Sequence, residues 1–348
     1  MLNNYEFSVN NFENITAYEY RKKTNKSHIF HSIEWMKIIK EALGVNHKIA
    51  ILKENNQIVA SIPFAFSRNL MKGPCALPLQ FTGYYNSILA DNNIIKAEIL
   101  TKFYQYCKEH GLYTQLPETN EIKDFKSFFG YSIYKLKIEV GKSVEEQILN
   151  CNNKRMRNYT KNAIKSELVT LKGGQELLNK FYSLHLQNMK ELGTPPFPKI
   201  YFKKIFQFLP KITKIILVMN QDQVCSGVMV LKITETELLT LTICTPRLFS
   251  TGLSSYLIYL EAAKLAQKWG CSIINFGRSI DGTGPALFKK RYGLEVTPLK
   301  MYSPDKNWTV TDPRNSSWRH AIRIWKKLPI SVTKLGGLFL AKNIIEIK

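Results

Sequence analysis

The sequence lacks a long apolar run: no stretch approaches the ~20 consecutive apolar residues that a membrane-spanning helix needs. The N-terminal segment 1–14 is polar and contains acids, so it does not show the basic-then-apolar pattern of a secretory signal. These absences predict a cytoplasmic protein, and they leave open a peripheral contact with the inner membrane face.

Paired metal or redox ligands are also missing. The six cysteines are scattered, and no two have the C-x-x-C spacing of a zinc or disulfide-exchange site. The six histidines are equally dispersed and form no H-E-x-x-H pattern. We therefore predict no metal site, no tightly bound cofactor, and free thiols in a reducing compartment.

Acids are scarce as well: Asp and Glu total 27 against 49 Lys and Arg, which gives a net charge of +22. Such an excess predicts anionic partners, namely nucleic acid, acidic lipid or phosphorylated substrates. The alternative is a general lysine-rich composition without functional meaning. With 348 residues, of which 45% are hydrophobic and 12% aromatic, the chain is long enough for two globular domains.

Helices and strands alternate along the predicted chain. Helical spacing and end signals predict helices at 33–43, 94–110, 143–166, 174–192, 253–269 and 285–292. Runs rich in β-forming residues predict strands at 48–52, 57–66, 132–140, 214–219, 223–233, 237–245, 272–276 and 294–302. This order predicts an α/β (α+β) fold with mixed, mainly antiparallel sheets. We expect domains at 1–140 and 141–312, followed by a basic tail at 313–348.

A basic helical face is the first candidate for ligand binding. Lys154, Arg157, Lys161 and Lys165 share one side of the predicted helix, with Asn158 among them. No acid interrupts the segment 151–165. Cations in a row suit a diphosphate or a nucleic-acid backbone. The alternative is a solvated surface, although unpaired like charges at this spacing reduce helix stability.

A loop rich in proline and aromatic residues follows the helix at 174–192. It contains Gly193-Thr194-Pro195-Pro196-Phe197-Pro198 and leads to Tyr201. Fixed φ angles lower the entropy of such a loop, so Phe197 and Tyr201 are candidates for the wall of a pocket. A structural turn that only ends the helix is an equally good interpretation.

The entry to the helix at 253–269 is the candidate for donor binding. It consists of Thr251, Gly252, Leu253 and Ser254. Helix N-termini with small residues offer N–H groups to anions such as a pyrophosphate. An ordinary helix start with a Ser or Thr cap explains the same residues.

The segment 275–293 carries the candidate catalytic groups. A short apolar strand is followed by Arg278 and Asp281, and then by a helix in which Lys289 lies about 100° from its apolar face. A lysine at the edge of a site stabilises an oxyanion or binds a phosphate, whereas Lys290 is expected to face water. The alternative for Lys289 is an ordinary surface lysine.

The tail shows an amphipathic pattern. One helical face carries Trp318, Ala321, Ile322, Trp325 and Leu328, and the other carries Arg319, Arg323, Lys326 and Lys327. The pattern is typical of a helix at a lipid interface. A helix that docks on the domain and exposes its cations fits equally well.

Taken together, these motifs resemble the FemAB-like, GNAT-related N-acyltransferases, and more narrowly the FemAB-related proteins of exopolysaccharide and exosortase systems. The resemblance spans 30–302 and rests on these pieces: His31-Ser32 with Trp35, Leu77-Pro78-Leu79 through Gly83, Lys154-Arg155-Met156-Arg157, Gly193-Thr194-Pro195-Pro196-Phe197, and Phe276-Gly277-Arg278-Ser279 through Phe288-Lys289 to Gly293. It implies two tandem GNAT-like domains with a site between them.

The resemblance also implies chemistry. An acyl or aminoacyl group would pass from acyl-CoA or aminoacyl-tRNA, as co-substrate, to an amine. Lys289 would lie near the reacting carbonyl, and Arg155, Arg157 or their neighbours would hold phosphate of the acceptor. The chain departs from the family in two respects: no coiled-coil arm is found, and the turn at Gly252 lacks the fuller glycine pattern of acetyl-CoA users.

The sequence therefore predicts an N-acyltransferase that modifies a phosphorylated or lipid-linked precursor of peptidoglycan or polysaccharide in the bacterial cell envelope. Possible partners include tRNA and an anionic membrane contacted through residues 314–340. The alternative is a non-catalytic RNA-binding or membrane-surface scaffold that uses the positive charge. No RNA-recognition motif supports the RNA-binding version.

Overall fold

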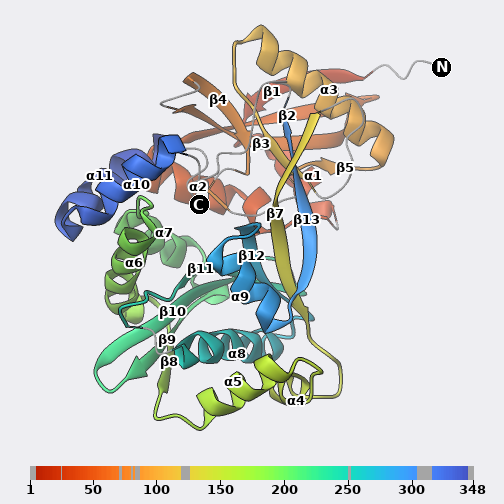
Figure 1. Ribbon diagram of the computed structural model, residues 1–348. Coiled ribbons are helices and arrows are strands. Elements are labelled where there is room, and N and C mark those ends of the chain that lie inside the picture. The colour runs from red at the N-terminus through yellow and green to blue at the C-terminus, as the bar shows by residue number, and fades with distance from the viewer. Residues whose placement is uncertain are drawn as a thin grey trace. The chain divides into compact units, whose positions relative to one another are not determined.

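The computed structural model describes residues 5–24, 26–69, 73–79, 81–82, 87–118, 126–249, 252–303 and 316–343. The chain divides into two compact units (Figure 1). The first comprises Met1–Gly130, Pro298–Thr311 and Lys342–Glu346, and the second mainly Tyr131–Thr297 and Asp312–Ala341. Two strands, β7 (Lys126–Lys137) and β13 (Glu295–Ser303), pass from one unit to the other. The domain ranges expected from the sequence stay predictions.

The first unit is built on an antiparallel sheet with the strand order β1-β2-β3-β4. Its strands are β1 (Glu6–Asn11), β2 (Asn46–Glu54), β3 (Gln57–Asn69) and β4 (Gly73–Pro78), while β5 (Leu89–Ala90) also pairs with β3 and β6 (Leu116–Glu118) pairs with β13. Asn55 and Asn56 both have positive φ, which suits the tight turn between β2 and β3.

Helices cover both faces of this sheet. They are α1 (Ile15–Lys23), α2 (Ile33–Leu43), α3 (Asn93–Glu109) and the short 3₁₀ helix η1 (Ile29–His31). Residues of β2 alternate between the two faces: Ala50 and Leu52 pack in the core that includes α3, and Ile49 and Ile51 pack against Ala17 of α1. Helix α1 has no recognisable signal in the sequence, because its mixed residues form no apolar stripe.

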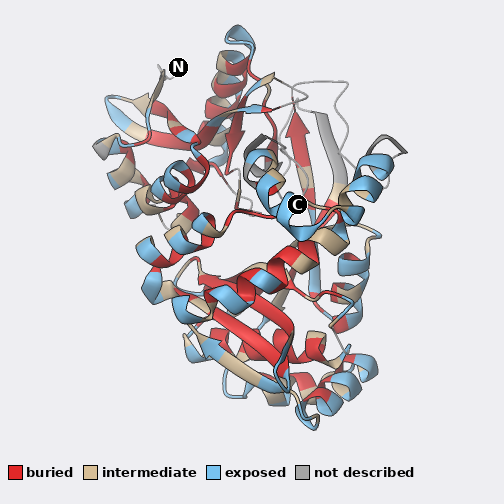
Figure 2. Cartoon of the chain, turned by 90° about the vertical axis from the view of Figure 1, so that its left-hand side faces the viewer, coloured by how far each residue is buried: buried red, intermediate tan, exposed pale blue. Residues whose placement is uncertain are grey.

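The second unit contains a sheet in which the strands from β7 follow the order β7-β12-β11-β10-β9-β8. These strands are β8 (Val169–Gly173), β9 (Thr213–Asn220), β10 (Gln223–Lys232), β11 (Glu237–Cys244) and β12 (Ile273–Ile280). All neighbours in this order are antiparallel except β11 and β12, which are parallel. Figure 2 shows that the strands are mostly buried, whereas the helices expose their outer sides.

The helices of the second unit lie on both sides of its sheet. They are α4 (Val144–Leu149), α5 (Lys154–Ile164), α6 (Leu178–Leu192), α7 (Lys199–Phe208), α8 (Leu253–Lys268), α9 (Gly284–Tyr292), α10 (Ser316–Lys327) and α11 (Ile330–Asn343). One core joins α5, α8 and α9 to alternate residues of the strands, including Ile216 and Val228. On the other side, Gly227 lies against Phe181 and Leu184 of α6. The α+β class with mixed, mainly antiparallel sheets is confirmed.

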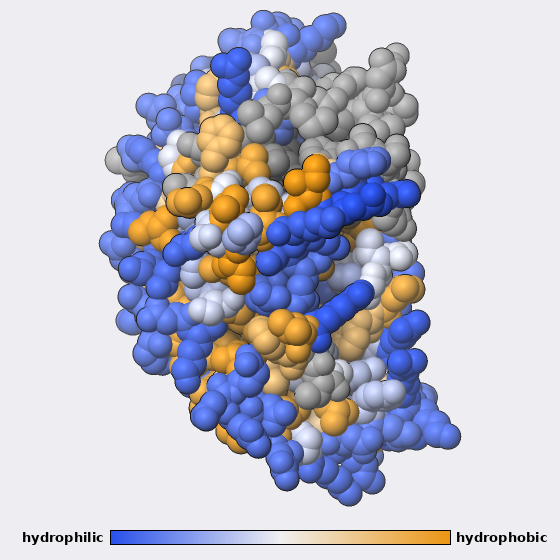
Figure 3. Space-filling view, turned by 60° about the vertical axis from the view of Figure 1, so that its left-hand side comes forward, coloured by the Kyte–Doolittle hydropathy of each residue, from blue (hydrophilic) through white to orange (hydrophobic). Residues whose placement is uncertain are grey.

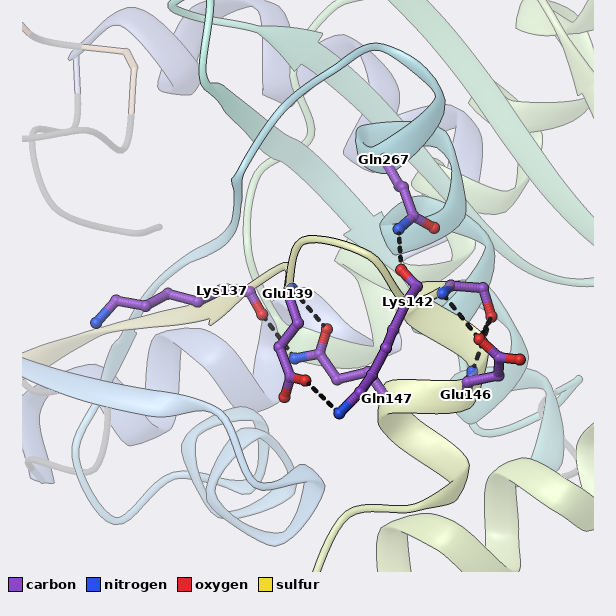
Figure 4. Close-up of polar contacts among 7 residues, drawn as sticks. Lys137, Glu139, Lys142, Glu146, Gln147 and Gln267 are labelled. Carbon is purple, nitrogen blue, oxygen red and sulfur yellow. Dashed lines mark hydrogen bonds and ion pairs between the residues drawn. The ribbon is translucent and has the colours of Figure 1, made fainter.

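The helix predicted at 143–166 is two helices, α4 and α5. The second helix begins after Asn153, because the Asn153 side chain accepts a hydrogen bond from the Met156 amide and caps α5. The approach to α4 is held by amide side chains (Figure 4). Gln267 of α8 donates to the Lys142 carbonyl at 2.7 Å and accepts from the Val144 amide at 2.9 Å. This long-range contact fixes the start of α4 and leaves no mark in the local sequence.

The two C-terminal helices belong to the second unit up to residue 341. Helix α10 contacts α6, and Ile322 lies against Gly193 at the end of α6. In α11, Gly337 contacts Pro196 and Gly336 faces Trp325. The apolar side of α10 therefore docks on the domain. In the part of the chain that the structure describes, no helix is long and apolar enough to cross a membrane.

Candidate active site

A backbone bulge in β12 shapes the centre of the candidate site. Pairing with β7 is regular through Asn275 and resumes at Arg278. Gly277 has φ 72°, a conformation that favours glycine. The buried Asn275 side chain holds the bulge, since its Oδ1 accepts from the Gly277 amide at 2.8 Å and its Nδ2 donates to Glu237 at 2.8 Å. The predicted strand at 272–276 therefore extends through the glycine rather than ending before it.

Lys289 is bound to this bulge. It is only 5% exposed, and its Nζ donates to the carbonyls of Phe276 at 2.5 Å and Gly277 at 3.1 Å. The Nζ also lies 5.2 Å from the centre of the Tyr134 ring. Burial lowers the pKa of Lys289 from 10.5 to about 7. Both the ammonium and the neutral amine are thus accessible near neutral pH.

Polar groups from β7 and the end of β12 lie on the same face of β7 as the lysine. Tyr134 and Ser132 are two residues apart in the strand, so both point to this face. The Ser132 hydroxyl donates to Asp281 at 2.8 Å. Burial, and then the charge of Asp281, raises the pKa of Tyr134. The Tyr134 hydroxyl is buried and makes no hydrogen bond of good geometry, although Ser132 is close enough to affect its pKa.

Arg278 points to the opposite face. It pairs with Ile133 across the two strands, and its guanidinium lies 5.1 Å from the centre of the Tyr131 ring. Residues that are directly opposite share a face, and neighbours along a strand alternate, so Arg278 is separated by β7 from Tyr134 and Lys289. The structure brings Lys289 and Asp281 to one side of β7 but does not place Arg278 with them.

The parallel strands β11 and β12 diverge beside this cluster. Their pairing covers only Glu237–Leu239 with Ile273–Asn275, although both strands continue. The last link is the Thr240 hydroxyl, which donates to the Asn275 carbonyl at 3.2 Å. Ligands of open α/β sheets bind at the carboxyl ends of parallel strands, and here the bulge and Lys289 lie at that end of β12.

The predicted donor-binding turn precedes α8, the helix that follows β11. Gly252 is its N-cap residue with φ 77° and supplies no capping side chain. Leu253 is half-buried, and Ser254 is buried with its carbonyl accepting from the Ser226 hydroxyl at 3.0 Å. Thr251 lies outside the described residues. Anion binding at this turn stays a prediction.

The predicted basic face lies on α5. Lys154, Asn158 and Lys161 are exposed, and so is Arg155, whose guanidinium lies 5.4 Å from the Tyr159 ring centre. Arg157 differs, because it is half-buried and its Nη1 donates to the Cys151 carbonyl at 2.8 Å. Arg157 therefore helps to hold the start of α5. The solvent-facing cations are Lys154, Arg155, Lys161 and Lys165, the last of which is the C-cap residue of α5.

The two predicted pocket aromatics are buried. Phe197 and Tyr201 stack with ring centres 4.3 Å apart, and Tyr201 is fully buried, which raises its pKa. Both join an aromatic cluster with Phe202 and His185. In this conformation they form core rather than an open wall, and their role in substrate binding stays a prediction.

Sequence reasoning assigned no role to Tyr134, Asn275 or Glu237. Tyr134 fell within a predicted strand and is distant in sequence from the lysine that it contacts. Asn275 carried a signal, since an amide inside an apolar strand needs a hydrogen-bond partner. Glu237 is the partner, and it also pairs with Lys135 at 2.9 Å.

Metal-binding clusters and pockets are the other features of the described ranges that could mark a second site. Within them, no group of three or more His, Cys, Asp or Glu side chains could hold a metal ion. A cavity of about 340 Å³ lies in the first unit and is lined by Tyr20, Lys23, Thr24, Lys26, Ala90 and Asp91. None of the predicted site residues lines it.

Comparisons with known proteins identify the fold. No family model matches the sequence, and no curated protein sequence matches it significantly. Solved structures do match. FemX has a TM-score of 0.61 with 12% identity over 84% of this chain and 96% of its own. A tandem GNAT protein from the clavulanic acid biosynthesis pathway has a TM-score of 0.53 with 8% identity, over 88% of this chain and 100% of its own.

A third structure is the C-terminal domain of a putative lysylphosphatidylglycerol synthetase from Agrobacterium fabrum. Its TM-score is 0.50 with 9% identity, over 71% of this chain and 81% of that domain. These likenesses define the class of the molecule: it has a tandem GNAT-type fold. The resemblance of the sequence to FemAB-like proteins is thereby confirmed at the level of the fold.

Proposed function

We propose that the protein is an N-acyltransferase that moves an acyl or aminoacyl group onto an amine. The fold supports this proposal, because the matched structures include a tandem GNAT protein, determined without acetyl-CoA, and a putative lysylphosphatidylglycerol synthetase. The observation that carries it is Lys289, a buried amine with a pKa lowered to about 7, held where two parallel strands diverge.

The acceptor amine attacks the thioester or ester of the donor. Its nitrogen forms a bond to the donor carbonyl carbon, and the carbonyl oxygen becomes an oxyanion. Two N–H groups of the protonated lysine are occupied by the Phe276 and Gly277 carbonyls, and the third donates to this oxyanion. The carbon–sulfur or carbon–oxygen bond of the donor then breaks, and the thiol or hydroxyl group leaves.

A proton must also leave the attacking amine. Asp281 is the candidate acceptor, since its carboxylate lies on the lysine's side of β7 and is oriented by Ser132. The leaving group is the other possible acceptor, in which case the substrate assists the reaction. In this proposal Arg278, which lies on the opposite face of β7, has no contact with the carbonyl that Lys289 reaches.

The substrates follow from the charged surfaces. The turn Thr251–Ser254 before α8 would bind the phosphates of acyl-CoA or the end of aminoacyl-tRNA. Lys154, Arg155 and Lys161 on α5 would bind phosphate on the acceptor, together with Asn158. We therefore propose a phosphorylated or lipid-linked cell-envelope precursor as the acceptor. Because Phe197 and Tyr201 are buried, the acceptor would contact them only after a local rearrangement.

The test compares Lys289→Met with Lys290→Met. Lys290 is the next residue of the same helix and is exposed. Transfer is followed as thiol release from acetyl-CoA and as loss of label from aminoacyl-tRNA, each with an extract of envelope precursors. We expect Lys289→Met to lower the rate by about 10²–10³-fold. Lys290→Met should keep the wild-type rate. An unchanged rate in Lys289→Met would exclude the lysine from the mechanism.

A contact with an anionic membrane surface is the second candidate activity. Helices α10 and α11 contain no acid, and Leu335 and Phe339 on α11 are 76% and 56% exposed. Ile324 on α10 is 64% exposed and Arg323 beside it is also exposed. Figure 3 shows hydrophilic and hydrophobic side chains next to each other on the face that these helices occupy. Apolar side chains among cations are the pattern of interfacial helices.

A further inference from the structure

Arg21 in α1 is a buried cation without a partner. Its side chain is 1% exposed, and Nε, Nη1 and Nη2 are all buried without a hydrogen bond to any described residue. Its guanidinium carbon lies 5.9 Å from the centre of the Tyr18 ring. Burial lowers the pKa of Arg21 to about 10, so it remains protonated at neutral pH. An unpaired buried charge is strongly unfavourable, which is why such groups are normally paired.

The ring of His31 is close enough to this guanidinium for the charge of Arg21 to lower its pKa. His31 is 1% exposed, and burial, followed by His28 and then Arg21, lowers its pKa well below the ordinary value. The ring is therefore neutral. Its Nδ1 accepts from the His28 amide at 3.3 Å, so the proton is on Nε2. This Nε2 is buried and makes no hydrogen bond of good geometry, although the Ser87 backbone is close enough to affect the pKa.

Among the residues that the structure describes, this cluster has donors and positive charge, and no acid contributes to either pKa. Neither the pKa of Arg21 nor that of His31 is affected by any carboxylate, since desolvation, histidines, a tyrosine and backbone groups account for both. The His28 ring lies against His31 in a tilted arrangement, with ring centres 3.9 Å apart, and brings no negative charge. An external anion would satisfy the guanidinium and the imidazole N–H together.

We propose that Arg21 and His31 form a phosphate-binding site in the first unit. The guanidinium provides a planar fork of N–H groups that matches two phosphate oxygens, and the His31 Nε2–H matches a third. A phosphate group fits this set of donors better than a carboxylate, which has only two oxygens. Because the guanidinium is 1% exposed, the ligand enters through a local opening, and the complex excludes water once formed. The proposal concerns binding and does not depend on the transferase reaction.

The experiment is a thermal-shift series on the full chain with orthophosphate, acetate and chloride at constant ionic strength. We expect orthophosphate to raise the unfolding midpoint of the wild type, since a ligand that binds only the native state stabilises it. Arg21→Gln should abolish this response. Arg68→Gln, which changes an exposed arginine of the same unit, should keep it. In phosphate-free buffer Arg21→Gln should be no less stable than the wild type, because it removes an unpaired charge.

Calorimetric titration of orthophosphate into the wild type and Arg21→Lys provides a second measurement. The lysine keeps the charge but loses the fork, so affinity should fall by about tenfold or more. Absence of phosphate binding to the wild type would refute the site, whatever the variants do. An equal phosphate response in Arg21→Gln would refute the role of Arg21, and stabilisation by acetate without any by phosphate would refute the choice of ligand.

Discussion

The amine of Lys289 has two acceptors in either protonation state. The carbonyls of Phe276 and Gly277 take two N–H bonds from an ammonium or from a neutral amine. What changes with the proton is the third position, which is an N–H in the ammonium and a lone pair in the amine. Burial penalises the charged form, and it is this penalty that brings the pKa to about 7.

This shift predicts how stability depends on pH. Below pH 7 the lysine is protonated in both the folded and unfolded states, so the burial penalty is fully present. Between pH 7 and 10.5 the unfolded chain binds more protons, and the free energy of unfolding therefore rises with pH. Relative to Lys289→Met, the wild type should gain about 2 kcal/mol between pH 7 and pH 9 in urea denaturation. Lys290→Met should follow the wild type, and a pH-independent difference between wild type and Lys289→Met would contradict the lowered pKa.

The sequence located Lys289 because its position follows from helical periodicity and from a family-like motif. It did not predict that the side chain is buried, since this depends on a bulge in another element. Arg278 shows the limit of sequence reasoning. Being close to the lysine in sequence suggested a shared site, but alternation along β7 puts the two on opposite faces.

At the scale of elements, the bulge in β12 is what gives the lysine its acceptors. Gly277 has φ 72°, and a Cβ placed there would find only the Thr240 carbonyl within 4 Å, at 3.9 Å. A substitution therefore costs backbone strain rather than a steric clash. The bulge itself requires Asn275 and Glu237, which come from strands that are far apart in sequence.

We expect Gly277→Ala to lower the free energy of unfolding by about 1–2 kcal/mol, the cost of a left-handed conformation. Relief of this strain would turn the Phe276 and Gly277 carbonyls away from Lys289 and weaken its hydrogen bonds. In a Lys289→Met background these bonds are already absent, so Gly277→Ala should lower the free energy of unfolding by less. Urea denaturation of the double-mutant cycle measures this coupling. Gly282→Ala provides the control, because Gly282 has φ 77° but makes no contact with the lysine that the structure records. Equal losses of unfolding free energy in both backgrounds would show that the conformation of the bulge is not coupled to Lys289.

Elements with a clear periodic pattern or clear end signals are predicted well from the sequence, and elements without them are not. Helix α2 has the predicted bounds, because Ser32 caps its start and Gly44 ends it in the left-handed region. The helices α1 and α7 were missed. In α7 the apolar residues follow a proline-rich loop whose composition suggests a pocket wall, and the fold buries Phe202 and Ile205 in the core.

For the whole molecule, the question is what the net charge of +22 serves. Ion pairs such as those of Lys172, Lys232 and Lys264 leave this excess untouched, because each pair joins one cation to one acid. Composition alone left nucleic acid, lipid and phosphorylated ligands open. In the structure, the cations of α10 and those of α5 other than Arg157 face solvent, and the cations of α10 lie beside exposed apolar residues.

The membrane contact is tested by flotation with vesicles that contain phosphatidylglycerol, against vesicles of phosphatidylcholine alone. We expect the wild type to bind the anionic vesicles and to be released by salt, because screening weakens the attraction of the cations. Leu335→Glu with Phe339→Glu should reduce binding by about tenfold or more, since each buried apolar side chain contributes about 1.5–3 kcal/mol. Ile94→Glu is the matched control, because Ile94 on α3 is an isolated apolar residue that is 77% exposed. If the double variant floats as the wild type does, α11 does not insert, and the charge of the molecule must serve soluble anions instead.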